Sequence, residues 1–323
     1  MKNFTKIALI ITLILAIAGG TLCAVGMGIG FQFSDFWDEV KTGEFSIGPL
    51  RHIPYIRYHN DDFDLEDDQA GKMSWTSQKT ENFQFAWKDM KKIEIDADYA
   101  GISIEEDTAG DKENLYLDVE YRKKDHRRQL KVVMDGETLK IEDQGTWRIR
   151  NDESVRITMR VPKELMESGY LKKIEVDQDA GYLHVDTPLT AEEIQLNIDA
   201  GECFVAEKMT AAKKISAEID AGRMELNELE TEELEMSAGI GELYTSQVQA
   251  EKIEISCGIG SVEVEVAGKE SDYSYEISCD VGNLQVGDHD YSGFGSERTI
   301  KNPGKKKMEI DCGVGDVDIS FVL

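Results

Sequence analysis

The sequence predicts an all-β protein, a parallel, right-handed β-solenoid with coils of about 20 residues, preceded by one N-terminal transmembrane helix. Three observations give this prediction. Apolar and polar residues alternate over long stretches, as in strands with one buried face. A glycine, first within Asp-Ala-Gly, recurs inside that alternation at nearly constant spacing. One uncharged stretch, long enough to cross a bilayer, stands near the N-terminus.

The recurring glycine anchors the repeat, with steps of 20, 21, 19, 19, 22 and 33 residues. Apolar residues occupy the positions seven, five, three and one before it and two after it, so the glycine shifts the side-chain alternation by one. Gln178 alone interrupts these columns. We expect a coil corner at each glycine, where a side chain would be disfavoured. The anchors are Gly181, Gly201, Gly222, Gly241, Gly260, Gly282 and Gly315.

Strand patterns begin before the first anchor. Residues 91–106 predict an opening coil around Gly101 with its phase displaced. The gap before Gly181 predicts further strands, with tight turns and a short helical turn at 163–168. Residues 287–307 predict a loop before the final strand pair. The strands expected in the gap are 115–121, 129–134, 138–143 and 154–162.

The N-terminus predicts a membrane anchor. Residues 7–31 contain no charge, Lys2 and Lys6 precede them, and acidic residues follow, which places residues 1–6 in the cytoplasm. A cleavable signal peptide, cut after Ala16-Ile17-Ala18, is the alternative. Residues 32–87 predict an acidic extracytoplasmic linker and residues 88–323 the solenoid. The expected location is therefore the cell membrane, crossed once, with the C-terminal domain outside.

The formal net charge of −28 disfavours nucleic acid and anionic lipid as partners of the whole surface, and favours cations or basic polymers. The one dense basic patch is RKKDHRRQLK, residues 122–131. It suits contact with anionic headgroups, an envelope polymer or the acidic linker, or else it is a soluble hairpin tip.

The five cysteines predict buried, unpaired side chains rather than a disulfide framework. Cys23 lies in the apolar segment, Cys203 faces inward, and the others share the column three residues before the glycine. A bridge between neighbours such as Cys257 and Cys279 is geometrically conceivable. A soft metal site is disfavoured because no histidine shares this column.

Outward positions carry acids in columns. Six residues before the glycine stand Glu175, Glu235, Glu254, Glu276 and Glu309. Stacked carboxylates repel one another, which raises their pKa values or recruits a divalent cation. The alternative is a solvated face whose aspartates favour the turn. The cation candidates are Asp179, Asp199 and Asp220, two residues before the glycine.

No catalytic constellation occurs in the sequence. The histidines are scattered, and HExxH, CxxC and GxSxG patterns are absent. The sequence therefore predicts no enzyme and no cofactor, although a carbohydrate-active β-helix enzyme stays as a third alternative, since carboxylate pairs are abundant.

The pattern I-x-V-x-x-x-x-G-x-L-x-V, with Val161-Pro162 and SDYSYEISCDVGNLQVG, resembles the bacterial putative-adhesin family, a group of unknown function, over about residues 90–320. The resemblance implies an exported or membrane-anchored β-solenoid in the cell envelope and supplies no catalytic residues. We therefore expect a binding or sensing module for an envelope polymer, glycan or protein. A structural or regulatory subunit of a membrane envelope-stress complex is the second expectation.

Overall fold

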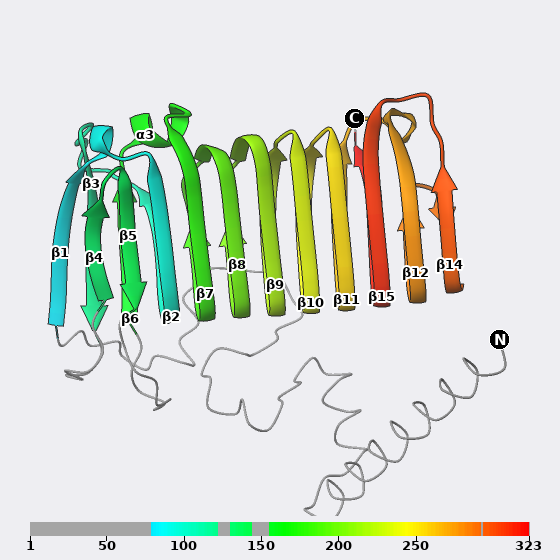
Figure 1. Cartoon of the computed structure of the whole chain (residues 1–323), viewed down its shortest axis with the longest axis horizontal. Coiled ribbons are helices and arrows are strands. Elements are labelled where there is room, and N and C mark those ends of the chain that lie inside the picture. The colour runs from blue at the N-terminus through cyan, green and yellow to red at the C-terminus, as the bar shows by residue number, and fades with distance from the viewer. Residues whose placement is uncertain (1–78, 122–129, 144–154, 292, 323) are drawn as a thin grey trace, which may run out of the picture. The chain divides into compact units, whose positions relative to one another are not determined.

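The computed structural model describes residues 79–121, 130–143, 155–291 and 293–322, and it is built almost entirely of β-strands in one 15-stranded sheet (Figure 1). The all-β prediction is therefore confirmed. The elements are β1 Lys79–Ala86, η2 Trp87–Asp89, β2 Lys92–Glu106, β3 Asn114–Tyr121, β4 Leu130–Asp135, β5 Thr138–Asp143, β6 Val155–Val161, α3 Lys163–Glu167, β7 Leu171–Val185, β8 Leu189–Val205, β9 Met209–Glu230, β10 Glu233–Gln249, β11 Lys252–Ala267, η3 Glu270–Asp272, β12 Tyr273–Val286, β13 His289–Asp290, β14 Gly293–Ile300 and β15 Lys306–Val322.

The long strands lie side by side and parallel, with equivalent residues of each repeat opposite one another. Ile198 of β8 pairs with Ile219 of β9, which pairs with Ala238 of β10, which pairs with Cys257 of β11. This register confirms the repeat read from the sequence. Turns between the strands line one edge of the sheet (Figure 1).

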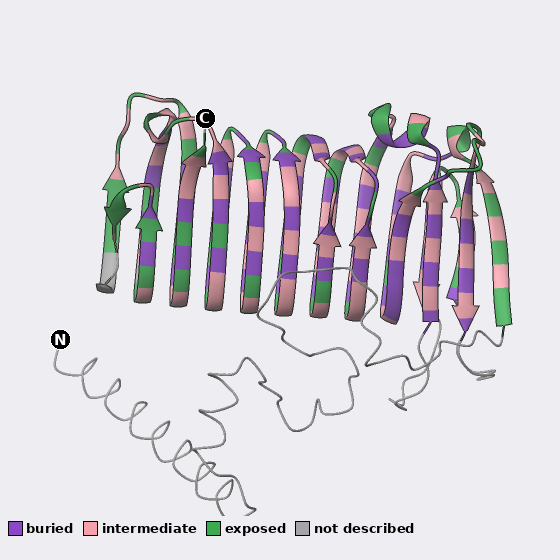
Figure 2. Ribbon diagram, turned by 180° about the vertical axis from the view of Figure 1, so that it is seen from behind, coloured by how far each residue is buried: buried purple, intermediate pink, exposed green. Residues whose placement is uncertain are grey.

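Each long strand has two arms that meet at its anchor glycine, and the buried positions change phase there. In β8, Ile194, Leu196 and Ile198 are buried before Gly201, whereas Cys203 is buried after it. The alternation of buried and exposed residues repeats from strand to strand (Figure 2). Apolar side chains from both arms form one hydrophobic core.

The anchor glycines are packed too tightly for any side chain. A Cβ on Gly222 would overlap the carbonyl oxygen of Gly201, and a Cβ on Gly201 would overlap that of Gly181. Gly201 also has a φ of 146°, which L-residues rarely adopt. The column is therefore glycine because adjacent backbones touch there, a reason additional to the corner conformation expected from the sequence.

Gln178, the one interruption of the apolar columns, lies inside the core at 2% exposure. Its Nε2 donates to the carbonyl oxygen of Ala100 at 2.5 Å, beside the first anchor glycine. It therefore joins β7 to β2, where the register changes so that Ala100 rather than Gly101 lies opposite Gly181. The displaced phase predicted for Gly101 is confirmed.

The residues between β2 and β7 form strands, as the sequence predicted, and the structure shows that these strands continue the sheet outward. β5 pairs with the first arm of β2 and β6 with its second arm, so two separate strands replace one bent strand. α3 is the predicted helical turn. β1 pairs antiparallel with β3, so Lys79–Ala86 belongs to the sheet although the sequence placed these residues in the linker.

The C-terminal end departs from the predicted order. β15 lies between β11 and β12, so the last strand in the chain is not the last strand of the sheet. The expected loop at 287–307 contains β13 and β14, which pair antiparallel with β12. β13 and β14 pair with one edge of β12, and β15 pairs with the opposite edge of β12.

Residues 7–31, the predicted transmembrane segment, lie outside the described residues, as do residues 122–129 of the basic patch. No helix in the part of the chain that the structure describes is long and apolar enough to cross a membrane.

Candidate functional site

The predicted cation candidates lie on adjacent strands, with Asp179 on β7, Asp199 on β8 and Asp220 on β9. All three are exposed. Partial burial of its carboxyl is the largest cause that raises the pKa of Asp179, and repulsion from Asp98 and Asp199 raises it further. Their carboxylates do not form one of the close acidic groups found among the described residues. Repulsion therefore acts on the carboxyl of Asp179, and the three carboxylates do not converge on one point.

The same repulsion extends to β2. Partial burial, and then the carboxylates of Asp98, Asp177 and Asp179, raise the pKa of Asp96. Asp177 is the register partner of Asp96 and accepts a hydrogen bond of 2.5 Å from Nδ2 of Asn197. On this crowded acidic surface, Asp96 and Asp179 therefore gain a proton more readily than isolated aspartates would.

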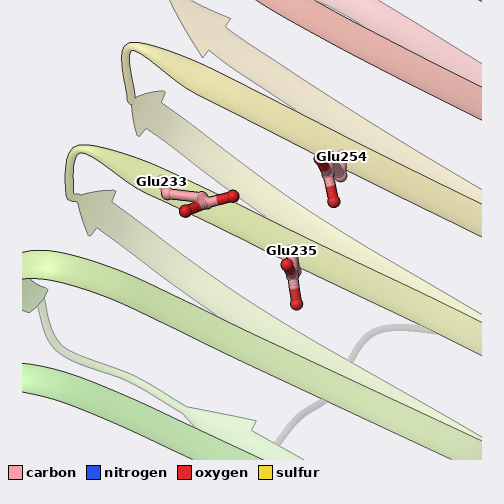
Figure 3. Close-up of side chains that lie close together, drawn as sticks. All are labelled: Glu233, Glu235 and Glu254. Atoms are coloured by element: carbon pink, nitrogen blue, oxygen red, sulfur yellow. The ribbon is translucent and has the colours of Figure 1, made fainter.

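Three carboxylates do converge on β10 and β11. Oxygens of Glu233, Glu235 and Glu254 all lie within 4.8 Å of one another, and all three residues are half-buried (Figure 3). The sequence placed Glu235 and Glu254 in one column but missed Glu233. The sequence does contain a signal for Glu233, because ELE at 233–235 and KIE at 252–254 occupy the same positions in two successive repeats.

Two lysines form ion pairs with this group. Nζ of Lys252 lies 2.9 Å from Oε1 of Glu233 and also contacts Glu254, while Nζ of Lys214 lies 2.6 Å from Oε1 of Glu235. The hydrogen bonds to Glu254 and Glu233 raise the pKa of Lys252, and the bond from Lys252 lowers the pKa of Glu233. Because an ammonium group occupies the place between the carboxylates, the arrangement works as an ion-pair network that ties β10 to β11.

The described thiols are buried and unpaired, as predicted. Cys203, Cys257 and Cys312 form no disulfide. Burial raises the pKa of Cys203 to about 12 and, with the charge of Asp316, raises that of Cys257. Since the thiolate is the reactive form, these side chains behave as small apolar groups.

A comparison against protein families matches the part of the chain that contains the repeat. The model of the Toastrack DUF4097 family matches residues 90–320. The chain belongs to this family. No curated protein matches it.

Several solved structures resemble the Toastrack domain at low identity. A putative adhesin from Bacteroides fragilis is 15% identical, with 75% of this chain and 98% of that chain covered and a TM-score of 0.41. A putative cell adhesion protein from Clostridium sporogenes is 13% identical, with coverages of 76% and 99% and a TM-score of 0.33. A putative lipid binding protein from Parabacteroides distasonis is 14% identical, with coverages of 76% and 98% and a TM-score of 0.34.

The two described histidines of the Toastrack domain lie far apart in the sheet. Nε2 of His184 on β7 lies 3.1 Å from Oδ1 of Asp186, and its ring packs edge-on against Phe204. His289 belongs to β13 and lies 3.8 Å from Glu270. Each histidine has a carboxylate neighbour of its own, and the two do not share a site.

One apolar column of the Toastrack domain faces solvent. Residues directly before the anchor glycines belong to the apolar pattern of the sequence, yet they protrude on four adjacent strands. The exposed side chains are Ile240 at 59%, Ile259 at 55%, Val314 at 51% and Val281 at 39%. Sequence alternation cannot reveal this, because the bend at each glycine reverses which side of the strand is covered.

Proposed function

We propose that this chain is a single-pass membrane protein whose N-terminus lies in the cytoplasm. It displays the Toastrack domain outside the cell as a right-handed β-solenoid that binds an envelope or extracellular component without catalysing a reaction. The apolar residues 7–31, with Lys2 and Lys6 before them, support the anchoring.

A row of four glutamates on adjacent parallel strands carries the binding proposal. Glu235 pairs with Glu254, which pairs with Glu309, which pairs with Glu276. Neighbouring strands are about 4.8 Å apart, so the glutamate row presents carboxylates at a regular spacing. Such a row suits an extended ligand with repeated positive groups, such as an amine-bearing or cation-loaded envelope polymer.

Two members of the glutamate row are the best placed to meet such a ligand. Glu276 and Glu309 are both exposed, and within the described residues neither forms an ion pair. Glu235 and Glu254, by contrast, are bound by lysines. We therefore assign the contact to the β15–β12 half of the row.

The full chain with Glu276→Gln and Glu309→Gln tests this assignment. We expect weaker retention on a purified envelope fraction and on polylysine, with a smaller salt dependence, because two carboxylates are lost from the row. The matched control is Glu207→Gln with Glu232→Gln, two exposed carboxylates in turns between strands. Equal retention of both double variants and the parent would reject the glutamate row as the binding face.

Protease accessibility on intact cells tests the topology. Cleavage of the Toastrack domain from outside, with an N-terminal tag protected, is the expected result. Protection of the whole chain would reject the external location. If the glutamate variants bind as the parent does and the chain co-purifies with a membrane complex, a structural or regulatory subunit is the better assignment.

A further inference from the structure

Lysines gather in the segment that runs from the end of β14 into the start of β15, residues 301–307, called here the basic loop. Its sequence, KNPGKKK, holds four lysines and no carboxylate. Nζ of Lys306 lies 3.6 Å from Oε1 of Glu251. The exposed lysines, which form no ion pair within the described residues, are Lys301, Lys305 and Lys307. A protein of formal net charge −28 thus presents a concentrated positive charge at one place.

Lys307 breaks an alternation of charge that the preceding strands maintain. Near the start of each strand from β7 to β11, a lysine and a glutamate are register partners. The series is Lys173, Glu193, Lys214, Glu233 and Lys252. On β15 the partner of Lys252 is Lys307, whose partner on β12 is Ser274. Like charges directly opposite one another destabilise a sheet, so a glutamate here would suit folding better. A residue that works against its own fold is expected at a functional site.

Hydrogen bonds tie the basic loop to η3 and β12. Nδ2 of Asn302 donates to the carbonyl oxygen of Tyr273 at 2.9 Å, and the backbone N–H of Asn302 donates to Oγ of Ser274 at 3.1 Å. The N–H of Gly304 donates to the carbonyl oxygen of Ser271 at 3.1 Å. A ligand therefore meets lysines whose backbone is already ordered, which lowers the entropic cost of binding.

We propose that the basic loop binds phosphate groups of an anionic polymer. Ammonium groups at successive positions suit successive negative charges along an extended chain. Lysine is a compact point charge with three donors, a form that binds phosphate. A planar carboxylate is matched better by the fork of an arginine, and the basic loop contains none.

The acids beside the basic loop leave most of its charge available. At physiological ionic strength charges are screened beyond about 8 Å, so neighbouring groups matter more than the net charge of the chain. Glu251 is paired with Lys306. Oδ2 of Asp272 accepts a hydrogen bond from the backbone N–H of Lys269 at 3.3 Å. Glu309 of the glutamate row follows the last lysine by two residues, so the contact runs from that lysine toward the start of the loop.

The surroundings of the basic loop argue against a membrane surface and a nucleic acid. The loop lies at the edge of the sheet that the turns between strands occupy (Figure 1). A flat anionic membrane against this edge would also meet exposed acids in the neighbouring turns, whereas a single polymer strand can reach the loop alone. These acids are Glu207, Glu232 and Glu251. The loop has no aromatic side chain on which nucleic-acid bases would stack.

Fluorescence anisotropy of a labelled poly(glycerol phosphate), titrated with the full chain in uncharged detergent micelles, tests the proposal. The loop variant is Lys305→Gln with Lys307→Gln. The matched control is Lys163→Gln with Lys213→Gln, two exposed lysines on α3 and β9. We expect the loop variant to bind at least about tenfold more weakly, with a smaller salt dependence, and the control to bind like the parent. Lys305→Arg with Lys307→Arg should retain binding because it keeps both charges.

A further variant separates binding from folding. Lys307→Glu places an acid opposite Lys252 and continues the alternation of charge. Polymer binding should therefore fall while Tm stays the same or rises. A lower Tm in this variant would show that Lys307 serves the fold, and would remove the argument for its role in binding.

Other results would overturn the proposal outright. These are a parent that does not bind the polymer, a loop variant that binds like the parent, and tighter binding of polyglutamate or single-stranded DNA than of the phosphate polymer. Recruitment to phosphatidylglycerol vesicles without polymer binding would assign the loop to a lipid surface instead.

The basic loop is a site separate from the glutamate row. The loop variant should bind polylysine as the parent does, and Glu276→Gln with Glu309→Gln should bind the phosphate polymer at least as well as the parent. The two proposals therefore fail separately.

Discussion

Cys257 on β11 lies directly opposite Cys312 on β15, and Cys312 in turn lies opposite Cys279 on β12. Cys257 and Cys279 are therefore not neighbours, and the bridge between them that the sequence left open is wrong. Their separation follows from the insertion of the C-terminal strand between two earlier ones. The cysteine column is thus part of the core beneath β11 and β15.

Placing a charge in this column should be strongly destabilising. Cys257 is 1% exposed, so Cys257→Asp buries an unpaired carboxylate and should lower the free energy of unfolding by about 3–5 kcal/mol. Cys257→Ala, which leaves only a small cavity, should cost about 1 kcal/mol. Urea unfolding followed by circular dichroism measures both. A Cys257→Asp protein as stable as the alanine variant would remove Cys257 from the core.

Alanine at an anchor glycine should disrupt the contact between adjacent strands. Gly201→Ala places a Cβ against the carbonyl oxygen of Gly181 and forces a residue with a side chain to adopt a φ of 146°. We expect a loss of about 2–4 kcal/mol in the free energy of unfolding.

The control for this prediction is Gly136→Ala. Gly136 also has a positive φ, of 62°, but nothing lies within 4 Å of its added Cβ. Its cost should be about 1 kcal/mol, from backbone conformation alone. Similar losses in the two variants would mean that close packing does not explain the glycine column.

Removing Lys252 should expose the carboxylate group to divalent cations. In the Lys252→Gln variant, Glu233 and Glu254 lose their shared ammonium, and Tm should fall modestly in calcium-free buffer, by the equivalent of about 1 kcal/mol or less. Millimolar calcium should then raise the variant's Tm, since oxygen ligands suit this ion.

Calcium should leave the parent's Tm nearly unchanged, because the ammonium group of Lys252 already pairs with Glu233 and Glu254. Lys213→Gln is the control, since Lys213 makes a single exposed pair with Glu192 at 2.7 Å. A calcium response in the parent as large as in the Lys252 variant would show that the acidic columns bind the ion elsewhere. Differential scanning calorimetry measures all three proteins.

The raised pKa values of Asp96 and Asp179 predict a pH-dependent penalty on folding. A carboxyl whose pKa is higher in the folded state holds its proton more tightly there, so its ionisation destabilises the fold. The contribution is fully favourable below the ordinary pKa of 3.8 and is lost as the pH rises through the folded-state pKa.

Asp96→Asn with Asp179→Asn should therefore raise the free energy of unfolding at pH 7, by about 0.5 kcal/mol or less because both residues are exposed. Near pH 4 the gain should shrink. Urea unfolding at the two pH values checks this, with Glu207→Gln and Glu232→Gln together as the control for the loss of two surface charges. A double variant less stable than the parent at pH 7 would contradict the repulsion.

Much of the fold could be predicted because its determinants repeat along the chain. The columns containing Ile198, Ile219 and Cys257 face the core in register, as their common distance from the glycine indicates. The free, buried state of Cys203 also followed from its inward phase. Such features depend on the two-residue period of a strand, which is local.

The candidate sites were less predictable because they depend on pairings between distant residues. Glu235 and Glu254 were expected in one column, but their convergence with Glu233 needed the register of β10 against β11. Lys252 closes that group because it is the register partner of Glu233. The stack of Asp179, Asp199 and Asp220 has the predicted order but does not converge.

The sequence by itself therefore determined the repeat unit, its glycine column and the faces of its straight arms, because side-chain alternation and spacing are written within each unit. Only the tertiary structure decided that β15 lies between β11 and β12, that β5 and β6 share the outer side of β2, and that Ile240 and Ile259 face solvent. The physical reason is that all units present similar edges for pairing. Which edges meet, and how each backbone bends at its glycine, is settled by contacts between residues far apart in the chain.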